Sequence, residues 1–296
     1  MRALITRTAG HLEVVEVATP EPAAGEIRLR VEAATVNPVD ATVLSGAYAA
    51  MITQQGPVGL GWDAAGTVSA VGAGVAASHP DLVLGARVAA LSGSFDKALG
   101  ALAEELVVPA DDVAVVPEGL GLVEAATVPL NTLTAHQALD LLGEPSGTLL
   151  VTGAAGAVGG YAVPLAVARG WEVVGLARES DRAFVEGAGA KLVTSLDGVT
   201  VDGVLDAAAL REAALGAVRD GGRFASVTGP LPTERGVEVL LVGVQPDGAR
   251  LADLLARTVA GVLPVRLDRT VPFDEADAAF ARLAESGVRG RVVLVP

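Results

Sequence analysis

A glycine-rich segment near the middle of the chain follows an apolar stretch. Residues 148–152 (TLLVT) have the composition of a buried strand, and residues 157–169 have that of an apolar helix. Between them, Ala154, Gly156 and Gly159 have the spacing of a G-x-G-x-x-G motif, with Ala at its first position. Such a motif lets the backbone approach a pyrophosphate, packs the helix closely on the strand and places free N–H groups at the phosphate. The segment predicts dinucleotide contacts from Ala155, Gly156, Ala157, Val158 and Gly159.

The next predicted strand, residues 171–176, is followed by a basic residue. An Asp or Glu at this point binds the 2′-hydroxyl of the NAD ribose, whereas Arg binds the 2′-phosphate of NADP. Arg178, Ser180 and Arg182 therefore predict NADP(H). Two alternatives stay open, because Glu179 is placed to bind a hydroxyl and Arg182 could lie on a solvated helix face. The glycine spacing alone also fits a tight strand-to-helix turn in any α/β protein.

The elements around this loop alternate between strand and helix. A helix is expected at 122–142, followed by strands at 148–152, 171–176, 201–206, 223–227 and 237–242 and helices at 157–169, 181–187, 210–218 and 250–260. Such alternation predicts a parallel, doubly wound sheet. The connection between residues 193 and 202 is too short for the usual crossover helix, so we expect that helix to be missing.

The two ends of the chain have a different pattern. Short strands broken by Gly, Pro and Asp precede the helix at 122–142, and residues 26–32 (EIRLRVE) alternate apolar and charged side chains as a half-buried strand does. After residue 261 a strand, a helix and a strand are expected at 265–271, 273–285 and 291–295. The α/β segment is therefore expected to be inserted between two pieces of one domain.

Composition excludes several classes of function. The chain of 296 residues has 21 Lys and Arg against 35 Asp and Glu, a net charge of −14, and 3% aromatic residues. Nucleic acid is therefore not an expected partner, because its binding needs cationic and stacking side chains. The chain contains no Cys, and His11, His79 and His136 lack metal-ligand spacing, so no metal site is expected.

The apolar runs of the chain do not predict a membrane protein. Glycine and proline interrupt both long uncharged runs, at 41–62 and 145–168, and this pattern is typical of strands, loops and buried helices. The first ten residues (MRALITRTAG) lack the apolar core of a signal peptide. The cytoplasm is therefore the expected location.

Short motifs follow one another in an order that resembles a known family. They are VNPVD at 36–40, SGAY at 45–48, GWDAAGTV at 61–68, GAGV at 72–75, GARV at 85–88, PLNTLTA at 129–135, the glycine loop, DGGR at 220–223 and GRVV at 290–293. Over essentially its whole length the chain resembles the zinc-free quinone oxidoreductase and enoyl reductase branch of the medium-chain dehydrogenase/reductase superfamily. The resemblance implies an α/β fold, with a GroES-like β-barrel catalytic domain at 1–118 and 260–296. It also implies a Rossmann domain at 119–259 with a doubly wound parallel sheet that binds NADP(H).

The resemblance also implies a reaction. Zinc-dependent members of the superfamily hold their metal with Cys, His and Glu, and this chain has no Cys. We therefore expect NADPH to reduce an activated C=C bond of an enone, or a quinone, without a metal. In enoyl reductases of this branch a Tyr after the Asn-Pro-x-Asp motif is a proposed proton donor, and Tyr48 stands at that position. Asn37 is the second catalytic candidate, because it would contact the substrate or the nicotinamide ribose. Tyr48 could instead only pack against the nicotinamide or close the cleft, and Asn37 could instead only form a turn that shapes the cleft floor.

Further contacts to NADP(H) are expected near the ends of other elements. Thr134 resembles the family Thr near the nicotinamide, and four residues end strands on the side where open sheets bind ligands, namely Thr228, Gly229, Gly243 and Val244. The chain departs from the family at 207–209, where Ala-Ala-Ala replaces Val-Gly-Gly. Residues 237–242 (VEVLLV) predict an edge strand, which a homodimer would cover.

Two other functions fit the same residues. A redox-silent cyclase or lyase of a biosynthetic pathway would use the cleft without consuming NADPH, and a sensor would bind NADPH only to set its conformation. The glycine loop and Arg178 are common to all three functions, so Tyr48 and Asn37 alone favour the reductase. The identity of the small-molecule substrate is not defined, but 49–59 and 92–105 are expected to line or cover the cleft.

Overall fold

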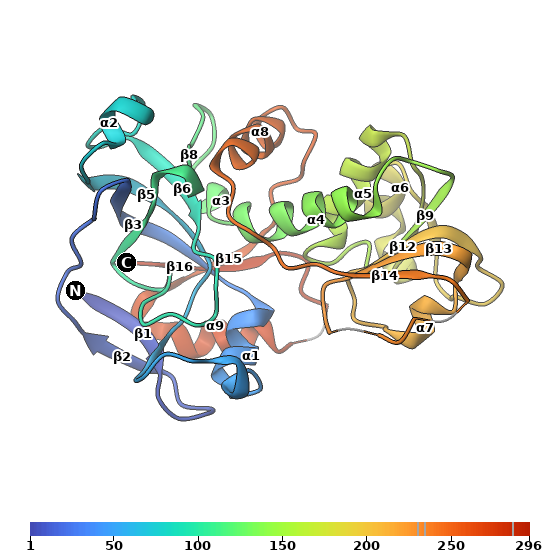
Figure 1. Cartoon of the computed structure of the whole chain (residues 1–296), viewed down its shortest axis with the longest axis horizontal. Coiled ribbons are helices and arrows are strands. Elements are labelled where there is room, and N and C mark those ends of the chain that lie inside the picture. The colour runs from blue at the N-terminus through green and yellow to red at the C-terminus, as the bar shows by residue number, and fades with distance from the viewer. Residues whose placement is uncertain (230, 234, 286) are drawn as a thin grey trace. The chain divides into compact units, whose positions relative to one another are not determined.

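A computed structural model describes residues 1–229, 231–233, 235–285 and 287–296 of the chain (Figure 1). The described residues form two compact units. Unit 1 comprises Met1–Leu130, Gln245–Gly261 and Val265–Pro296, and unit 2 comprises Asn131–Val244 and Val262–Pro264. Unit 1 is thus discontinuous in sequence.

Unit 1 is built mainly from antiparallel strands. These are β1 (Arg2–Thr6), β2 (Glu13–Glu16), β3 (Glu26–Val36), β4 (Val58–Gly59), β5 (Asp63–Val71), β6 (Arg87–Leu91), β7 (Glu105–Pro109), β8 (Val113–Val115), β15 (Leu267–Pro272) and β16 (Arg291–Val295). One sheet has the order β2-β1-β4, and the larger has the order β15-β16-β3-β5-β6-β8, with β7 also paired to β3. The first half of β3 alternates buried and more exposed side chains, so the half-buried strand expected at 26–32 is confirmed.

The helices of unit 1 are short. They are α1 (Pro38–Leu44), α2 (Val75–Ser78), α3 (Leu122–Ala125), α8 (Gly248–Val259) and α9 (Ala276–Leu283), with 3₁₀ turns η1 (Ala49–Met51), η2 (Ala110–Asp112) and η4 (Phe273–Glu275). The compact units differ from the expected division at 118 and 260, because α3 contacts β3 and β5 while α8 contacts β8. A Cβ on Gly248 would lie 2.4 Å from Val113 O, so α8 begins directly against this unit.

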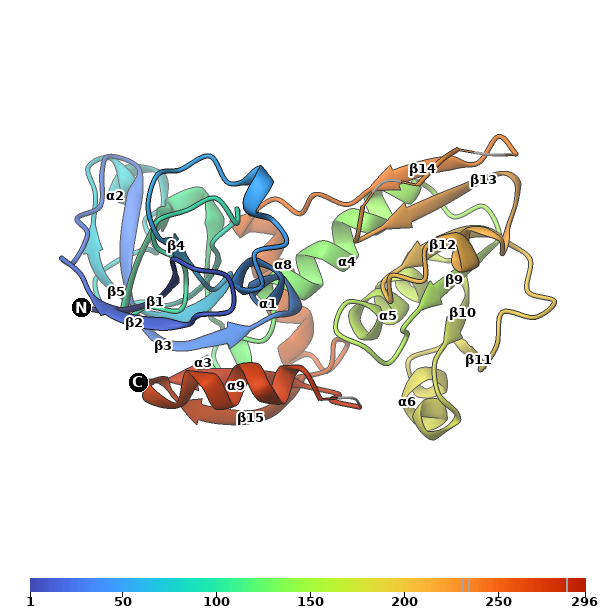
Figure 2. The same ribbon diagram turned by 90° about the horizontal axis from the view of Figure 1, so that it is seen from below.

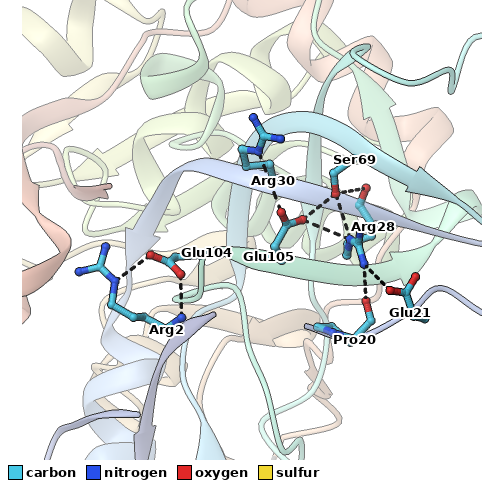
Figure 3. Close-up of polar contacts among 8 residues, drawn as sticks. All are labelled: Arg2, Pro20, Glu21, Arg28, Arg30, Ser69, Glu104 and Glu105. Carbon is cyan, nitrogen blue, oxygen red and sulfur yellow. Dashed lines mark hydrogen bonds and ion pairs between the residues drawn. The ribbon is translucent and has the colours of Figure 1, made fainter. Parts of the chain in front are cut away.

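Polar side chains tie β3 to its neighbours in the larger sheet (Figure 3). Arg28 Nε donates to Ser69 Oγ of β5 at 3.1 Å, and Ser69 Oγ donates to Glu105 Oε2 of β7 at 2.6 Å. Arg28 also donates to Pro20 O at 3.0 Å. Since the Arg28 and Glu105 side chains are only 16% and 18% exposed, these contacts replace much of the water that would otherwise solvate the two charges.

Unit 2 contains one parallel sheet flanked by helices. Its elements are α4 (Pro129–Leu142, from Asn131 on), β9 (Thr148–Thr152), α5 (Gly159–Arg169), β10 (Glu172–Leu176), η3 (Glu179–Asp181), α6 (Arg182–Gly187), β11 (Lys191–Val193), β12 (Val201–Asp206), α7 (Glu212–Leu215), β13 (Val218–Ser226) and β14 (Glu238–Leu241). The strand order β11-β10-β9-β12-β13-β14 is the 3-2-1-4-5-6 order of dinucleotide-binding folds. Figure 2 shows these strands as a continuous sheet, with α6 next to β11. The expected doubly wound parallel sheet is confirmed.

The connection from β11 to β12 has no helix. Residues 194–200 connect the two strands as an irregular segment. The absence of a helix agrees with the prediction made from the small number of residues in this connection. Leu196 and Val199 of this segment pack against the core cluster that contains Leu150, Val204 and Phe224. Two apolar side chains therefore cover a part of the sheet that a crossover helix would otherwise bury.

Other helices differ from expectation in length. The helix expected at 122–142 is divided into α3 and α4 (Pro129–Leu142), because the residue before a proline is disfavoured in helical conformation. The helix expected at 210–218 is reduced to α7, since β13 already begins at Val218. Among the described residues, none of the helices combines the length and the hydropathy needed to span a bilayer.

Strand β14 lies at one edge of the sheet in unit 2. Among the described strands it pairs with β13 alone, and Leu241 is 53% exposed. Such an edge offers unpaired backbone groups to another chain. Homodimer formation through this strand stays a prediction.

Candidate functional site

The glycine loop joins β9 to α5 by a tight turn. Gly153 has a φ of +59°, a left-handed conformation that favours glycine. A Cβ on Gly159 would lie 2.2 Å from Gly153 O, so only glycine lets the helix begin this close to the strand. The turn is made at Gly153, and the next residue, Ala154, is buried. Alanine at the first position of the motif is therefore compatible with the loop.

The same loop presents backbone N–H groups at the start of α5. Gly156, Ala157 and Val158 are half-buried, whereas Ala155 and Gly159 are buried. Gly156 N donates to Gly153 O at 2.7 Å, so this N–H group is not available to a phosphate. Gly156 instead lets a phosphate approach the backbone closely, because it has no side chain. The first N–H groups of an α-helix have no acceptor within the helix, and the helix dipole favours an anion there. The start of α5 therefore fits a pyrophosphate.

The basic residues after β10 differ in their partners. Arg182 donates to Glu179 Oε1 and to Glu186 Oε1, both at 2.6 Å, and these carboxylates raise the pKa of its guanidinium. The same contact lowers the pKa of Glu179, whose carboxylate is engaged with Arg182. Arg178 is exposed, and the part of the chain that the structure describes provides no ion pair for it. Ser180 is exposed beside it. Arg178 therefore carries the available positive charge.

A buried hydroxyl without a partner lies at the ligand-binding edge of the sheet. Thr228 follows β13, and its Oγ1 is buried without a hydrogen bond to any described residue. Gly229 next to it is exposed, and Gly243 and Val244 follow β14 at the same edge. Because carboxyl ends of parallel strands form the ligand side of an open sheet, the unsatisfied hydroxyl of Thr228 fits a bound polar ligand.

Thr134, the remaining predicted contact to the nicotinamide, is buried within α4.

Asp206, which no sequence motif singled out, organises the loop after β12. Asp206 Oδ1 accepts from Thr152 Oγ1 at 2.6 Å, and Asp206 Oδ2 accepts from Arg211 N at 2.8 Å. The loop includes two non-glycine residues in the left-handed region, Ala209 with φ +56° and Arg211 with φ +54°. Ala209 stands where the resembled family has glycine, so a strained alanine replaces it. An Asp at the end of a predicted strand was the available signal.

In unit 1, two buried carboxylates are joined through Asn37. Asn37 N donates to Asp40 Oδ2 at 2.9 Å, and Asn37 Nδ2 donates to Asp63 Oδ2 at 2.7 Å. Asp40 also accepts from Gly61 N, and Asp63 from Leu130 N. Burial raises the pKa of Asp40 to about 6 and that of Asp63 to about 7, against the effect of these hydrogen bonds. Asn37 is itself buried and its amide is bound to Asp63, so the structure gives it a positioning role, and its catalytic role stays a prediction.

A lysine lies close to these two carboxylates. Lys97 Nζ donates to Gly61 O at 2.7 Å and to Ser92 O at 2.8 Å, and it lies 5.0 Å from the centre of the Trp62 ring. Desolvation lowers the pKa of Lys97 to about 8, and the charges of Asp40 and Asp63 act in the opposite direction. Its ammonium group is therefore enclosed by protein acceptors although the residue as a whole is half-buried.

Tyr48 stands immediately before η1 and is half-buried. Its ring centre lies 5.0 Å from that of Phe95, and the two ring planes are inclined by 34°. Within residues 1–229, 231–233, 235–285 and 287–296, its hydroxyl makes no hydrogen bond. Tyr48 therefore combines a ring held by packing with a donor that is available to a ligand. The other tyrosine, Tyr161, is fully buried in α5.

Two family models match the chain. The model described as "Alcohol dehydrogenase GroES-like domain" matches residues 23–118, and the model described as "Zinc-binding dehydrogenase" matches residues 179–294. A 2-methylene-furan-3-one reductase of Solanum lycopersicum is 30% identical, over 100% of this chain and 79% of its own length. A chloroplastic quinone-oxidoreductase homolog of Spinacia oleracea is 36% identical over 65% of this chain. The match spans only 58% of the spinach protein.

Solved structures share the fold over the whole chain. The quinone oxidoreductase of Coxiella burnetii has a TM-score of 0.86 at 25% identity, covering 100% of this chain and 99% of its own. A mycobacterial protein complexed with NADPH has a TM-score of 0.81 at 27% identity, covering 100% of both chains. An alcohol dehydrogenase of Pyrobaculum aerophilum with bound cobalt and zinc has a TM-score of 0.84 at 27% identity, covering 100% of this chain and 99% of its own.

The residues of this chain do not fit a zinc ion of the kind that some of these names mention. The chain has no Cys. Among the described residues, no three His, Asp or Glu side chains come together as possible metal ligands. Zinc in proteins needs three or four such donors. Unit 2, in contrast, has the strand order and the glycine loop that fit a dinucleotide.

Proposed function

The chain belongs to the medium-chain dehydrogenase/reductase superfamily, and from this membership we propose that it is an NADPH-dependent reductase of enones or quinones. The observation that carries the proposal is the cofactor edge of unit 2, where the unpaired Arg178 follows the strand next to the glycine loop. Relatives named as a quinone-oxidoreductase homolog and as a 2-methylene-furan-3-one reductase support the choice of acceptor.

The residues of unit 2 divide the binding of NADPH among them. N–H groups of Ala157, Val158 and Gly159 bind the pyrophosphate, and Gly156 allows its close approach. Arg178 and Ser180 bind the 2′-phosphate. Arg182 does not bind it directly and acts only through its charge, which Glu179 and Glu186 neutralise. Thr228, Gly229, Gly243, Val244 and Thr134 contact the nicotinamide half. NADPH bound in this way supplies a hydride.

Residues of unit 1 serve the acceptor. Reduction of a conjugated C=C bond places negative charge on the acceptor oxygen, and this oxygen needs a hydrogen-bond donor. The unpartnered hydroxyl of Tyr48 is the donor we assign to it. No step uses zinc, and the lack of a donor set among the described residues supports that assignment.

The test follows NADPH consumption with a cyclic enone, an alkenal and a benzoquinone, and measures NADPH binding separately by fluorescence titration. We expect at least one acceptor to be reduced. Tyr48→Phe is expected to lower kcat by roughly 10²-fold with unchanged NADPH affinity, because it removes a positioned acid. NADPH binding without reduction of any acceptor would instead support a sensor, and product formation without NADPH consumption would support a cyclase or lyase.

A further inference from the structure

Three successive side chains hold the loop that packs against Tyr48. We propose that Phe95, Asp96 and Lys97, together called the brace, fix the position of the Tyr48 ring and so determine whether its hydroxyl reaches the acceptor. The proposal deepens the reductase function and rests on it. The brace residues are positioning residues, since they act through Tyr48.

Phe95 makes the direct contact. Its ring centre lies 5.0 Å from that of Tyr48, and both rings pack on the apolar core of unit 1. The Tyr48 hydroxyl makes no hydrogen bond to a described residue, so no polar contact of its own side chain fixes the ring. The position of the Tyr48 side chain therefore depends on packing, and Phe95 is the aromatic part of that packing.

Asp96 joins the loop of Phe95 to the segment that follows Tyr48. Its Oδ2 accepts from Thr53 N at 3.0 Å and from Thr53 Oγ1 at 2.6 Å, and its Oδ1 accepts from Gln54 N at 3.0 Å. Gln54 Nε2 in turn donates to Lys97 O at 3.1 Å. These contacts lower the pKa of Asp96, so its carboxylate stays ionised at neutral pH. The segment that follows Tyr48 and the loop that contains Phe95 are therefore joined by hydrogen bonds.

Lys97 anchors the same loop on its other side. Its Nζ donates to Gly61 O, to Ser92 O and, at 3.2 Å, to Ser92 Oγ. An ammonium group has three hydrogens, and these acceptors use all of them. Lys97 thus has no donor left for a substrate. Its contribution is to hold the connection between β4 and β5 at Gly61 against Ser92, which follows β6.

The contacts of the three brace residues connect Gly61 to the segment of Tyr48. Lys97 binds Gly61, and Asp96 binds Thr53, which lies five residues after Tyr48 in the chain. Moving the Tyr48 ring requires breaking the Phe95 contact or the hydrogen bonds that fix the loop. We therefore expect loss of any brace residue to misplace Tyr48 without changing the cofactor residues of unit 2. Catalysis is sensitive to such displacement, because a donor must lie within hydrogen-bond reach of the acceptor.

The kinetic test uses the variants Phe95→Ala and Phe95→Tyr. Phe95→Ala is expected to lower kcat for the reduced acceptor by about tenfold, with NADPH affinity unchanged, and Phe95→Tyr is expected to restore most of it. In a Tyr48→Phe background, Phe95→Ala is expected to cost less than twofold, since both changes act on the same donor. Phe280→Ala, which truncates another partly buried Phe of unit 1, is the matched control. A tenfold loss that persists in the Tyr48→Phe background would overturn the proposal.

A second measurement does not depend on turnover. The chain has 2 Tyr, so protein labelled with 3-fluorotyrosine gives two ¹⁹F signals, and Tyr48→Phe identifies one of them. Phe95→Ala, Asp96→Asn and Lys97→Met are each expected to shift or broaden the Tyr48 signal while the Tyr161 signal stays in place. An unchanged Tyr48 signal in all three variants would contradict the brace. If wild-type protein reduces no acceptor but the Tyr48 signal shifts in the variants, the reductase function fails, and only the claim that the brace holds the Tyr48 ring is retained.

Discussion

Replacing Arg178 with Ser is expected to weaken NADPH binding by roughly 10- to 100-fold and to change NADH binding by less than about twofold. Arg178 is exposed without an ion-pair partner among the described residues, directly after the strand next to the glycine loop. Its guanidinium is therefore free to form charge-assisted hydrogen bonds with the 2′-phosphate, which NADH lacks. Fluorescence titration with both nucleotides measures the ratio of the two dissociation constants.

Arg182→Ser is the matched control for this prediction. Arg182 is only four positions away, but Glu179 and Glu186 already occupy its donors. We expect Arg182→Ser to leave the NADPH to NADH ratio within about threefold of wild type, because the guanidinium is already paired with two carboxylates and has few donors left for the nucleotide. Equal losses in both variants would show that net charge, rather than a specific contact, selects the nucleotide. An unchanged ratio in Arg178→Ser would remove Arg178 from the site.

Raising the pH from 5 to 7.5 is expected to lower the free energy of unfolding by a few kcal/mol through the two buried carboxylates. Burial raises the pKa of Asp63 from 3.8 to about 7 and that of Asp40 from 3.8 to about 6. Between those values the folded chain binds more protons than the unfolded chain. The stabilisation is thus fully present below pH 3.8 and is lost as the pH rises through the folded pKa, at about 1 kcal/mol per pH unit for each group.

Asp63→Asn isolates the larger of these contributions. The variant cannot ionise at this position, so its unfolding free energy is expected to fall with pH only about half as steeply as that of wild type. Lys97 contributes little in this range, because with a pKa of about 8 it stays mostly charged in the folded chain and fully charged in the unfolded chain. Asp277→Asn removes an exposed carboxylate and serves as the control. Urea unfolding at several pH values measures the slopes, and equal slopes in wild type and Asp63→Asn would contradict the buried-carboxylate interpretation.

Local sequence patterns predicted much of unit 2. Gly156 and Gly159 stand at the spacing that the turn requires, and the steric limits at Gly159 follow from contacts a few residues away. The missing helix before β12 could also be predicted, because chain length alone decides whether a crossover helix fits. The ion pair between Arg182 and Glu186 was not predicted, although their i,i+4 spacing is a local signal for it.

Long-range contacts decided what the sequence could not predict. The roles of Asn37, Asp63 and Lys97 depend on groups that are far away in the chain, including Gly61 and Leu130. The spacing of apolar residues along the sequence does not indicate contacts between residues that are far apart in the chain. The burial of Asn37 and the use of all three Lys97 donors could therefore be seen only in the folded chain. The extent of unit 1 has the same cause, since α8 packs on β8 across more than a hundred residues of sequence.

The transfer of deuterium from labelled NADPH tests the reductase assignment most directly. Protein is incubated with a cyclic enone and NADPH deuterated at C4 of the nicotinamide, in separate samples for each face, and the product is analysed by NMR. The proposed function predicts a saturated ketone with deuterium at the carbon β to the carbonyl, from one of the two labelled forms. Deuterium at the carbonyl carbon of an allylic alcohol, or NADPH that binds but is not consumed with any enone or quinone, would contradict it.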